Sequence, residues 1–290
     1  MSALPSPTSP SSQIPFGATS RRDNWWVEPL LNFIGFTTFV IYSLWVTFTP
    51  ELPVGDLGQV MTYKWPPVPA GEHGSHGWVY LSPFFSPEFG GSWWKYSPAI
   101  LVLWMPLGFR ATCYYYRKMY YRTYFMDPPG CAVGDHKGHK YAGETAFPWI
   151  LQNAHRWFLY LAIYVVAVLW FDALRALWIP ADAAAAIKAA GGEVSAGFHF
   201  GIGNAIMLLN AAFLSFYTFG CHALRHLVGG NIDCWSCTKF GKTRHKLWTI
   251  VTRLNEHHMF WAWVSMIVVG LTDLYVRMLV LLNVPFKPWL

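Results

Sequence analysis

Long apolar segments alternate along the chain with polar stretches rich in proline and glycine. A helix that crosses a bilayer needs about 20 predominantly apolar residues. The segments that meet this requirement are residues 29–50, 97–124, 151–178, 198–227 and 256–282. This pattern predicts an all-α integral membrane protein with five transmembrane helices in a bundle.

The polar stretches divide the chain unevenly. Residues 1–23 are rich in proline and serine and contain no apolar run typical of a cleavable signal peptide, so we expect a flexible tail. Residues 24–290 then form one membrane-anchor domain. The long connection over 51–95 is rich in proline, glycine and aromatic residues and is expected to be ordered against the helix ends.

Lysine and arginine are distributed unequally between the connections. Segments 117–156 and 225–253 are strongly basic, whereas 51–95 and 172–197 are not. The positive-inside rule therefore predicts a cytoplasmic N-terminus and an external C-terminus in the cell membrane. Asp273 and Arg277, inside the last segment, are four residues apart and are expected to neutralise each other.

Composition agrees with a membrane location and excludes some functions. Hydrophobic residues make up 54% of the chain and charged residues only 12%, against about 25% charged in a soluble domain. The net charge of +6 is modest and its cations flank apolar segments, so no nucleic acid is expected as a partner. The chain shows no internal repeat, which argues against a transporter.

Two residue pairs near the end of the fourth segment have the spacing of metal ligands. His222 and His226 lie one helical turn apart, and Cys234 and Cys237 form a C-x-x-C turn that can present two thiolates to one metal. Two cysteines and two histidines are the ligands of a Rieske [2Fe–2S] centre and also of a structural zinc site. The residue types leave both possibilities open.

Three further cysteines bear on this assignment. Cys113 could supply a thiolate from a neighbouring helix in place of a loop cysteine. Cys221 is expected to be a buried apolar residue, because it points about 100° away from His222 on a continuous helix. The sequence does not decide the role of Cys131.

Aromatic and basic residues near the membrane surface are candidates for quinone binding. Arg110, Arg117 and Tyr114 fit either an interfacial anchor, or a docking surface for a soluble subunit with a quinone headgroup held below it. Trp25 and Trp26 fit either an aromatic belt or the wall of a quinone pocket, and the belt is the simpler interpretation.

Histidines at two predicted helix starts, His155 and His258, are candidate proton donors because histidine titrates near neutral pH. Ordinary interfacial histidines are an equally good interpretation. The basic residues Lys239, Lys242 and Arg244 are expected to help retain a soluble partner.

Several motifs together resemble the membrane-anchor subunit SdhC of actinobacterial succinate dehydrogenase. They are the run from Cys113 to Arg122, Pro128–Cys131, His155-Arg156 and Gly220–His226. The resemblance implies an enzyme complex in which a flavoprotein oxidises succinate, an iron–sulfur subunit relays electrons and the anchor passes them to menaquinone. A further small membrane subunit would be compatible with it.

The resemblance also bears on the cofactor. Five-helix anchors of this kind usually hold two haems b through histidines, one of them on the first helix, but segment 29–50 contains no histidine. Cys113 occupies a position where such relatives place a haem ligand. The resemblance therefore implies a Rieske-type [2Fe–2S] cluster in the anchor, with haem b or a structural zinc knuckle as the alternatives.

Overall fold

The computed structural model describes most of the membrane-spanning part of the chain. The described residues are 15–48, 80–86, 99–135, 145, 147, 149–189, 191–230, 232–282, 286, 287 and 289. Most of the tail and of connection 51–95 lies outside them, so neither expectation is tested.

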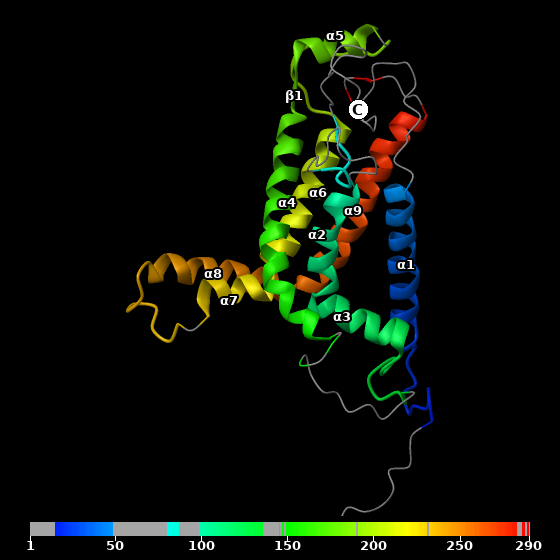
Figure 1. Ribbon diagram of the computed structural model, residues 1–290, viewed down its shortest axis with the longest axis vertical. Coiled ribbons are helices and arrows are strands. Elements are labelled where there is room, and N and C mark those ends of the chain that lie inside the picture. Colours follow the sequence, from blue (N-terminus) through cyan, green and yellow to red (C-terminus); the bar gives the residue numbers. More distant parts are fainter. Residues whose placement is uncertain are drawn as a thin grey trace, which may run out of the picture.

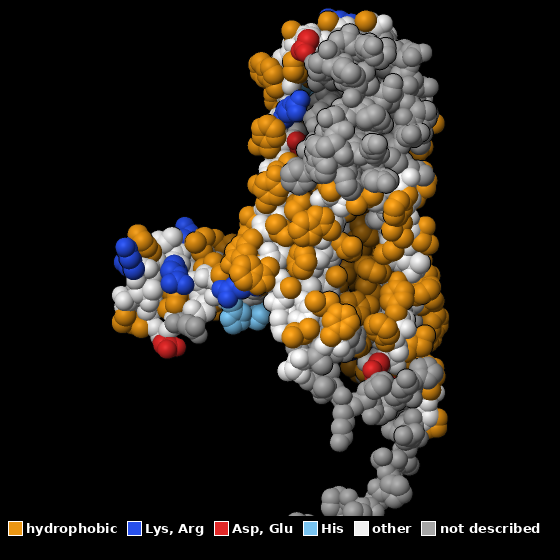
Figure 2. All heavy atoms as spheres, viewed as in Figure 1, with side chains coloured by type: hydrophobic (Ala, Val, Ile, Leu, Met, Phe, Trp, Pro, Cys, Tyr) orange, Lys and Arg blue, Asp and Glu red, His pale blue; other side chains and the backbone are white. Residues whose placement is uncertain are grey.

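Among the described residues, four helices are long and apolar enough to cross a membrane. They are α1 (Val27–Phe48), α4 (His155–Arg175), α6 (Ile202–Phe219) and α9 (His258–Leu281). They run side by side along the long axis of the molecule (Figure 1), and apolar side chains cover much of the bundle surface (Figure 2). The bundle has two ends, which we call the α3 end (Tyr114–Tyr120) and the α5 end (Ala181–Ala189).

The predicted second transmembrane helix is wrong in its length. Within the described residues α2 covers only Ala99–Ala111, and the chain then turns into the short α3 and a π-helix, Tyr121–Phe125. Segment 97–124 is thus not one continuous helix, and five full-length spans are not confirmed.

The backbone leaves the α-helical hydrogen-bond pattern at Cys113. The Thr112 amide still bonds to the Gly108 carbonyl four residues back at 3.1 Å, whereas the Cys113 amide bonds to the Arg110 carbonyl only three residues back. Cys113 itself is extended, with φ −72° and ψ 135°. The aromatic run that follows therefore lies across the end of the bundle as α3 (Figure 1).

The predicted fourth helix is also shorter than 198–227. α6 ends at Phe219, and after Gly220 and the extended Cys221 a separate helix α7 begins, His222–Gly229. A β-carbon on Gly220 would lie 2.7 Å from the carbonyl oxygen of Phe216 and 3.2 Å from Nδ1 of His258. Glycine is thus required where this junction approaches the start of α9.

Segments between the predicted helices contain regular structure that the apolar pattern does not reveal. At the α5 end, strands β1 (Trp178–Ile179) and β2 (Gly197–Phe198) pair antiparallel around α5. After α7, helix α8 (Gly241–Glu256) returns the chain to α9. α7 and α8 together project sideways from the bundle (Figure 1).

The core is built by α2, α4, α6 and α9, with α1 packed on α9 and on the π-helix. The predicted pair in α9 is confirmed: Arg277 Nε lies 3.1 Å from a carboxylate oxygen of Asp273, and both side chains are buried. Tyr42 of α1 and Ser82 also donate hydrogen bonds to this carboxylate. A shared ionic network thus links α1, residues 80–86 and α9.

Candidate functional site

Four helix junctions meet at the α3 end of the bundle. Cys113 precedes α3, Cys221 precedes α7, and His155 and His258 are the first residues of α4 and α9. We call these four residues the junction site. The sequence separates them by up to 145 positions, and the breaks in segments 97–124 and 198–227 bring them together.

The junction site contains two close pairs, each with one thiol and one imidazole. His155 Nε2 lies 3.1 Å from the sulfur of Cys221, and His258 Nε2 lies 3.8 Å from the sulfur of Cys113. Because Cys113 and Cys221 belong to one buried cluster, the two pairs lie in the same region of the bundle.

Both thiols are removed from solvent. Cys113 and Cys221 are 2% and 1% exposed and belong to one apolar cluster with Phe109, Tyr217 and Met266. Burial raises the pKa of the Cys113 thiol, and it raises the pKa of the Cys221 thiol to about 11. Metal coordination deprotonates a thiol despite such an environment.

Aromatic rings fix the two imidazoles in place. His155 stacks on Phe109 with ring centroids 4.7 Å apart, and His258 stacks on Tyr217 at 5.0 Å. Nδ1 of His155 lies 2.9 Å from the Thr112 hydroxyl. In contrast, the buried Nδ1 of His258 has no hydrogen-bond partner among the described residues.

A buried cation borders the junction site. The guanidinium of Arg110 bonds to Tyr116, to the carbonyl of Ala262 at 3.1 Å and to the hydroxyl of Ser265 at 3.0 Å. It also lies 4.8 Å from the centroid of the Tyr217 ring. Within the described part of the chain no carboxylate forms an ion pair with it.

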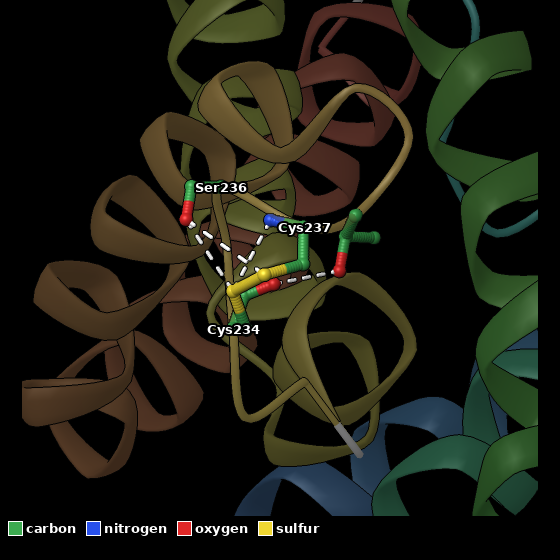
Figure 3. Close-up of a disulfide and its surroundings, with 4 residues drawn as sticks. Cys234, Ser236 and Cys237 are labelled. Atoms are coloured by element: carbon green, nitrogen blue, oxygen red, sulfur yellow. Dashed lines mark hydrogen bonds between the residues drawn. A yellow bond between two sulfur atoms is a disulfide. The ribbon is translucent and has the colours of Figure 1, made fainter.

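The loop motif predicted to bind the metal is arranged differently. His222 and His226 do approach each other, with their Nε2 atoms 3.0 Å apart. Cys234 and Cys237 are joined in a disulfide at the far end of the projecting hairpin (Figure 3). Over the described ranges, no three His, Cys, Asp or Glu side chains converge as ligands of a single metal ion.

A two-iron cluster needs a different arrangement of protein ligands from a single metal ion. Each iron takes two protein ligands, and in Rieske centres the ligands are two cysteines and two histidines. The junction site supplies these donor types as two mixed thiol–imidazole pairs, with Cys113, Cys221 and His258 buried and His155 partly buried. Its donor types are therefore those of such a cluster, whereas Cys234 and Cys237 are bonded to each other in this structure.

The residues predicted to bind a quinone do not gather in one place. Trp25 lines an open cavity of about 400 Å³ together with Arg21, Arg122 and Cys131, and Arg110, Arg117, Tyr114 and Trp26 are not among its lining residues. Arg117 instead covers the ring of Tyr114, 5.3 Å from its centroid, and Trp26 is exposed. Of the five, Arg110 has a buried guanidinium that lies against Tyr217 beside the junction site.

Comparison with known proteins identifies the family. Residues 27–281 match the family model described as actinobacterial succinate dehydrogenase subunit SdhC. A chain of the Mycobacterium smegmatis Sdh1 complex in the apo form is 34% identical, with a TM-score of 0.71. The similarity covers 95% of this chain and 94% of that one.

No curated protein matches the chain. The match to the family model spans nearly the whole described bundle, including all four residues of the junction site. The chain therefore belongs to the actinobacterial SdhC family, the membrane-anchor subunits of succinate dehydrogenase.

Proposed function

We propose that this anchor carries a Rieske-type [2Fe–2S] cluster at the junction site and conducts electrons from an iron–sulfur subunit to menaquinone. The observation that supports this most strongly is that two thiol–imidazole pairs lie at one end of the bundle, formed by the buried Cys113, Cys221 and His258 and the partly buried His155. When bound, the cluster would supply one-electron transfer at a potential raised by its histidine ligands.

The proposal changes the roles assigned to the two histidines. As ligands, His155 and His258 would face the cluster with the nitrogens that now face the thiols. Thr112 would then orient the ring of His155 through Nδ1, as groups behind a ligating histidine commonly do. Proton donation would fall to other groups near the membrane surface.

Arg110 is the best candidate to hold the quinone headgroup. Its buried guanidinium is a fixed hydrogen-bond donor beside Tyr217, whose ring stacks on His258. A cation in a water-poor site stabilises negative charge as it develops on a quinone oxygen.

Serine substitutions at the cysteines test the proposal. Replacing Cys113 or Cys221 should remove the cluster's paramagnetic signal and reduce quinone reduction by at least about 100-fold, because a ligand is lost. Succinate oxidation by an artificial acceptor should remain, since it needs only the soluble subunits. The matched control is Cys131→Ser, which changes an exposed thiol beside Arg122.

Substitution of Cys234 could give a result that contradicts the proposal. If Cys234→Ser abolishes the signal while Cys221→Ser leaves it intact, the C-x-x-C loop holds the centre and the junction site does not. Zinc or haem in the purified anchor, without the extra cluster, would leave the SdhC assignment unchanged but exclude this electron path.

A further inference from the structure

Helices α7 and α8 form an arm, residues 222–256, that leaves the bundle at the α3 end. The arm projects roughly perpendicular to α4 and α6, at the level where these helices end or begin (Figure 1). Because α4 and α6 have the length and composition of membrane spans, an arm perpendicular to them lies parallel to the bilayer plane.

Side-chain contacts hold the two helices of the arm together. Arg225 bonds through Nε to the hydroxyl of Thr252 at 3.1 Å and lies 5.0 Å from the centroid of the Trp248 ring. Arg244 bonds to the carbonyl of Val228 at 2.9 Å. At Gly229 a β-carbon would lie 2.2 Å from the Trp248 ring, so the helices touch closely. The arm is thus a packed element.

An apolar stripe remains uncovered on α8. Leu247 and Ile250 are each 48% exposed, and Leu254, on the same face, is partly exposed. These positions recur at three- and four-residue spacing, which places them on one side of a helix. An exposed apolar stripe on a helix lying along a bilayer fits insertion into the interface.

A basic stripe runs beside the apolar one. Lys242, Lys246 and Arg253 are exposed and share a face, again at helical spacing. Among the described residues, none of them forms an ion pair. Lysine and arginine also gather visibly on the arm (Figure 2). Long basic side chains next to a buried apolar face can reach lipid phosphates.

We propose that the arm lies in the headgroup layer of the bilayer and binds anionic phospholipids through Lys242, Lys246 and Arg253. Leu247 and Ile250 enter the upper acyl region. Two features favour this partner over a soluble subunit: the apolar stripe adjoins the basic one, and the arm extends sideways along the membrane. The inference does not depend on the cofactor at the junction site.

A photo-crosslinker at Ile250 tests which partner contacts the arm. Benzoylphenylalanine would replace Ile250 in the complete complex, reconstituted in nanodiscs of phosphatidylglycerol and phosphatidylcholine. Irradiation should give phospholipid adducts whose ratio of phosphatidylglycerol to phosphatidylcholine is at least about fivefold that of the bilayer, the preference one basic residue confers. Adducts with another subunit, or lipid adducts without enrichment, would overturn the proposal.

Neutralising the basic stripe separates its contribution from that of the apolar stripe. With Lys242→Gln, Lys246→Gln and Arg253→Gln, total lipid adducts at Ile250 should persist while their composition falls to that of the bilayer. The control Lys188→Gln, on the exposed side of α5, should keep the enrichment. Release of the soluble subunits by the triple substitution, with enrichment retained, would show a protein-docking surface instead.

Discussion

Individual buried charges stabilise this bundle through shared hydrogen bonds. Asp273 accepts from Tyr42, Ser82 and Arg277, so a single carboxylate ties α1 and residues 80–86 to α9. The Arg277 guanidinium also lies 5.2 Å from the centroid of the Trp45 ring. Charged groups at membrane depth are costly unless they are paired in this way.

Replacement of Asp273 by Asn should strongly destabilise the anchor. The Arg277 cation would remain buried without its counter-ion, which costs about 3–5 kcal/mol. The midpoint of thermal unfolding in detergent should fall clearly. Asp182→Asn, at an exposed position of α5, is the control and should leave the midpoint unchanged.

The double variant Asp273→Leu/Arg277→Met sharpens this test. Because it removes both charges, it should recover much of the lost thermal stability. If the single variant Asp273→Asn unfolds at the same temperature midpoint as the native chain, the ion pair does not stabilise the bundle.

Cys221 shows why some site residues are not visible in the sequence. On a continuous helix it points away from His222, and this geometry predicts an inert buried thiol. The chain instead breaks at Gly220, so Cys221 precedes α7 and turns toward His155. Gly220, which follows a long apolar run, could have indicated this break from the sequence, since glycine often ends a helix.

At the scale of elements, apolar length alone locates the spanning helices. α1, α4 and α9 begin and end within a few residues of the predicted boundaries. The α2–α3 break has no comparable signal, because the aromatic and basic residues after Ala111 can continue a helix. At the break the Cys113 amide bonds three residues back, and the Cys113 thiol lies beside the distant His258, a contact that the local sequence does not reveal.

The α6–α7 junction offers a test at this scale. Gly220→Ala would place a methyl group 2.7 Å from the carbonyl of Phe216 and 3.2 Å from His258 Nδ1. The junction must then shift, and quinone reduction should fall more steeply than thermal stability. Spectroscopy of the purified complex would show whether the metal centre is altered or lost.

Gly35→Ala is the matched control for that substitution. Its new methyl group would lie 3.6 Å from the Trp263 ring, an ordinary packing distance, and alanine favours a helix. Native activity in Gly220→Ala would show that the close approach of the junction to α9 is not needed for function.

For the whole molecule, membership of the SdhC family implies that other subunits of succinate dehydrogenase bind to the anchor. The α3 end carries the aromatic and basic run with Arg117, Lys118 and Arg122, partly exposed beside the junction site. We expect the soluble subunits to dock on this end, because it places their electron donor near the four junction residues.

Neutralising Arg117, Lys118 and Arg122 to Gln should weaken retention of the soluble subunits during purification. The loss should be greatest at raised salt, where the remaining electrostatic attraction is screened. Subunit stoichiometry on a sizing column measures it. Equal retention in variant and native complexes across the salt series would place the docking surface elsewhere.

The central claim concerns what the junction site holds. Electron paramagnetic resonance of the reduced, purified complex, with iron, zinc and haem quantified on the same sample, tests it most directly. The account predicts a Rieske-type signal in addition to the signals of the iron–sulfur subunit, with two further irons per complex, as a [2Fe–2S] cluster requires. Absence of that signal, with zinc or haem in its place, would contradict it.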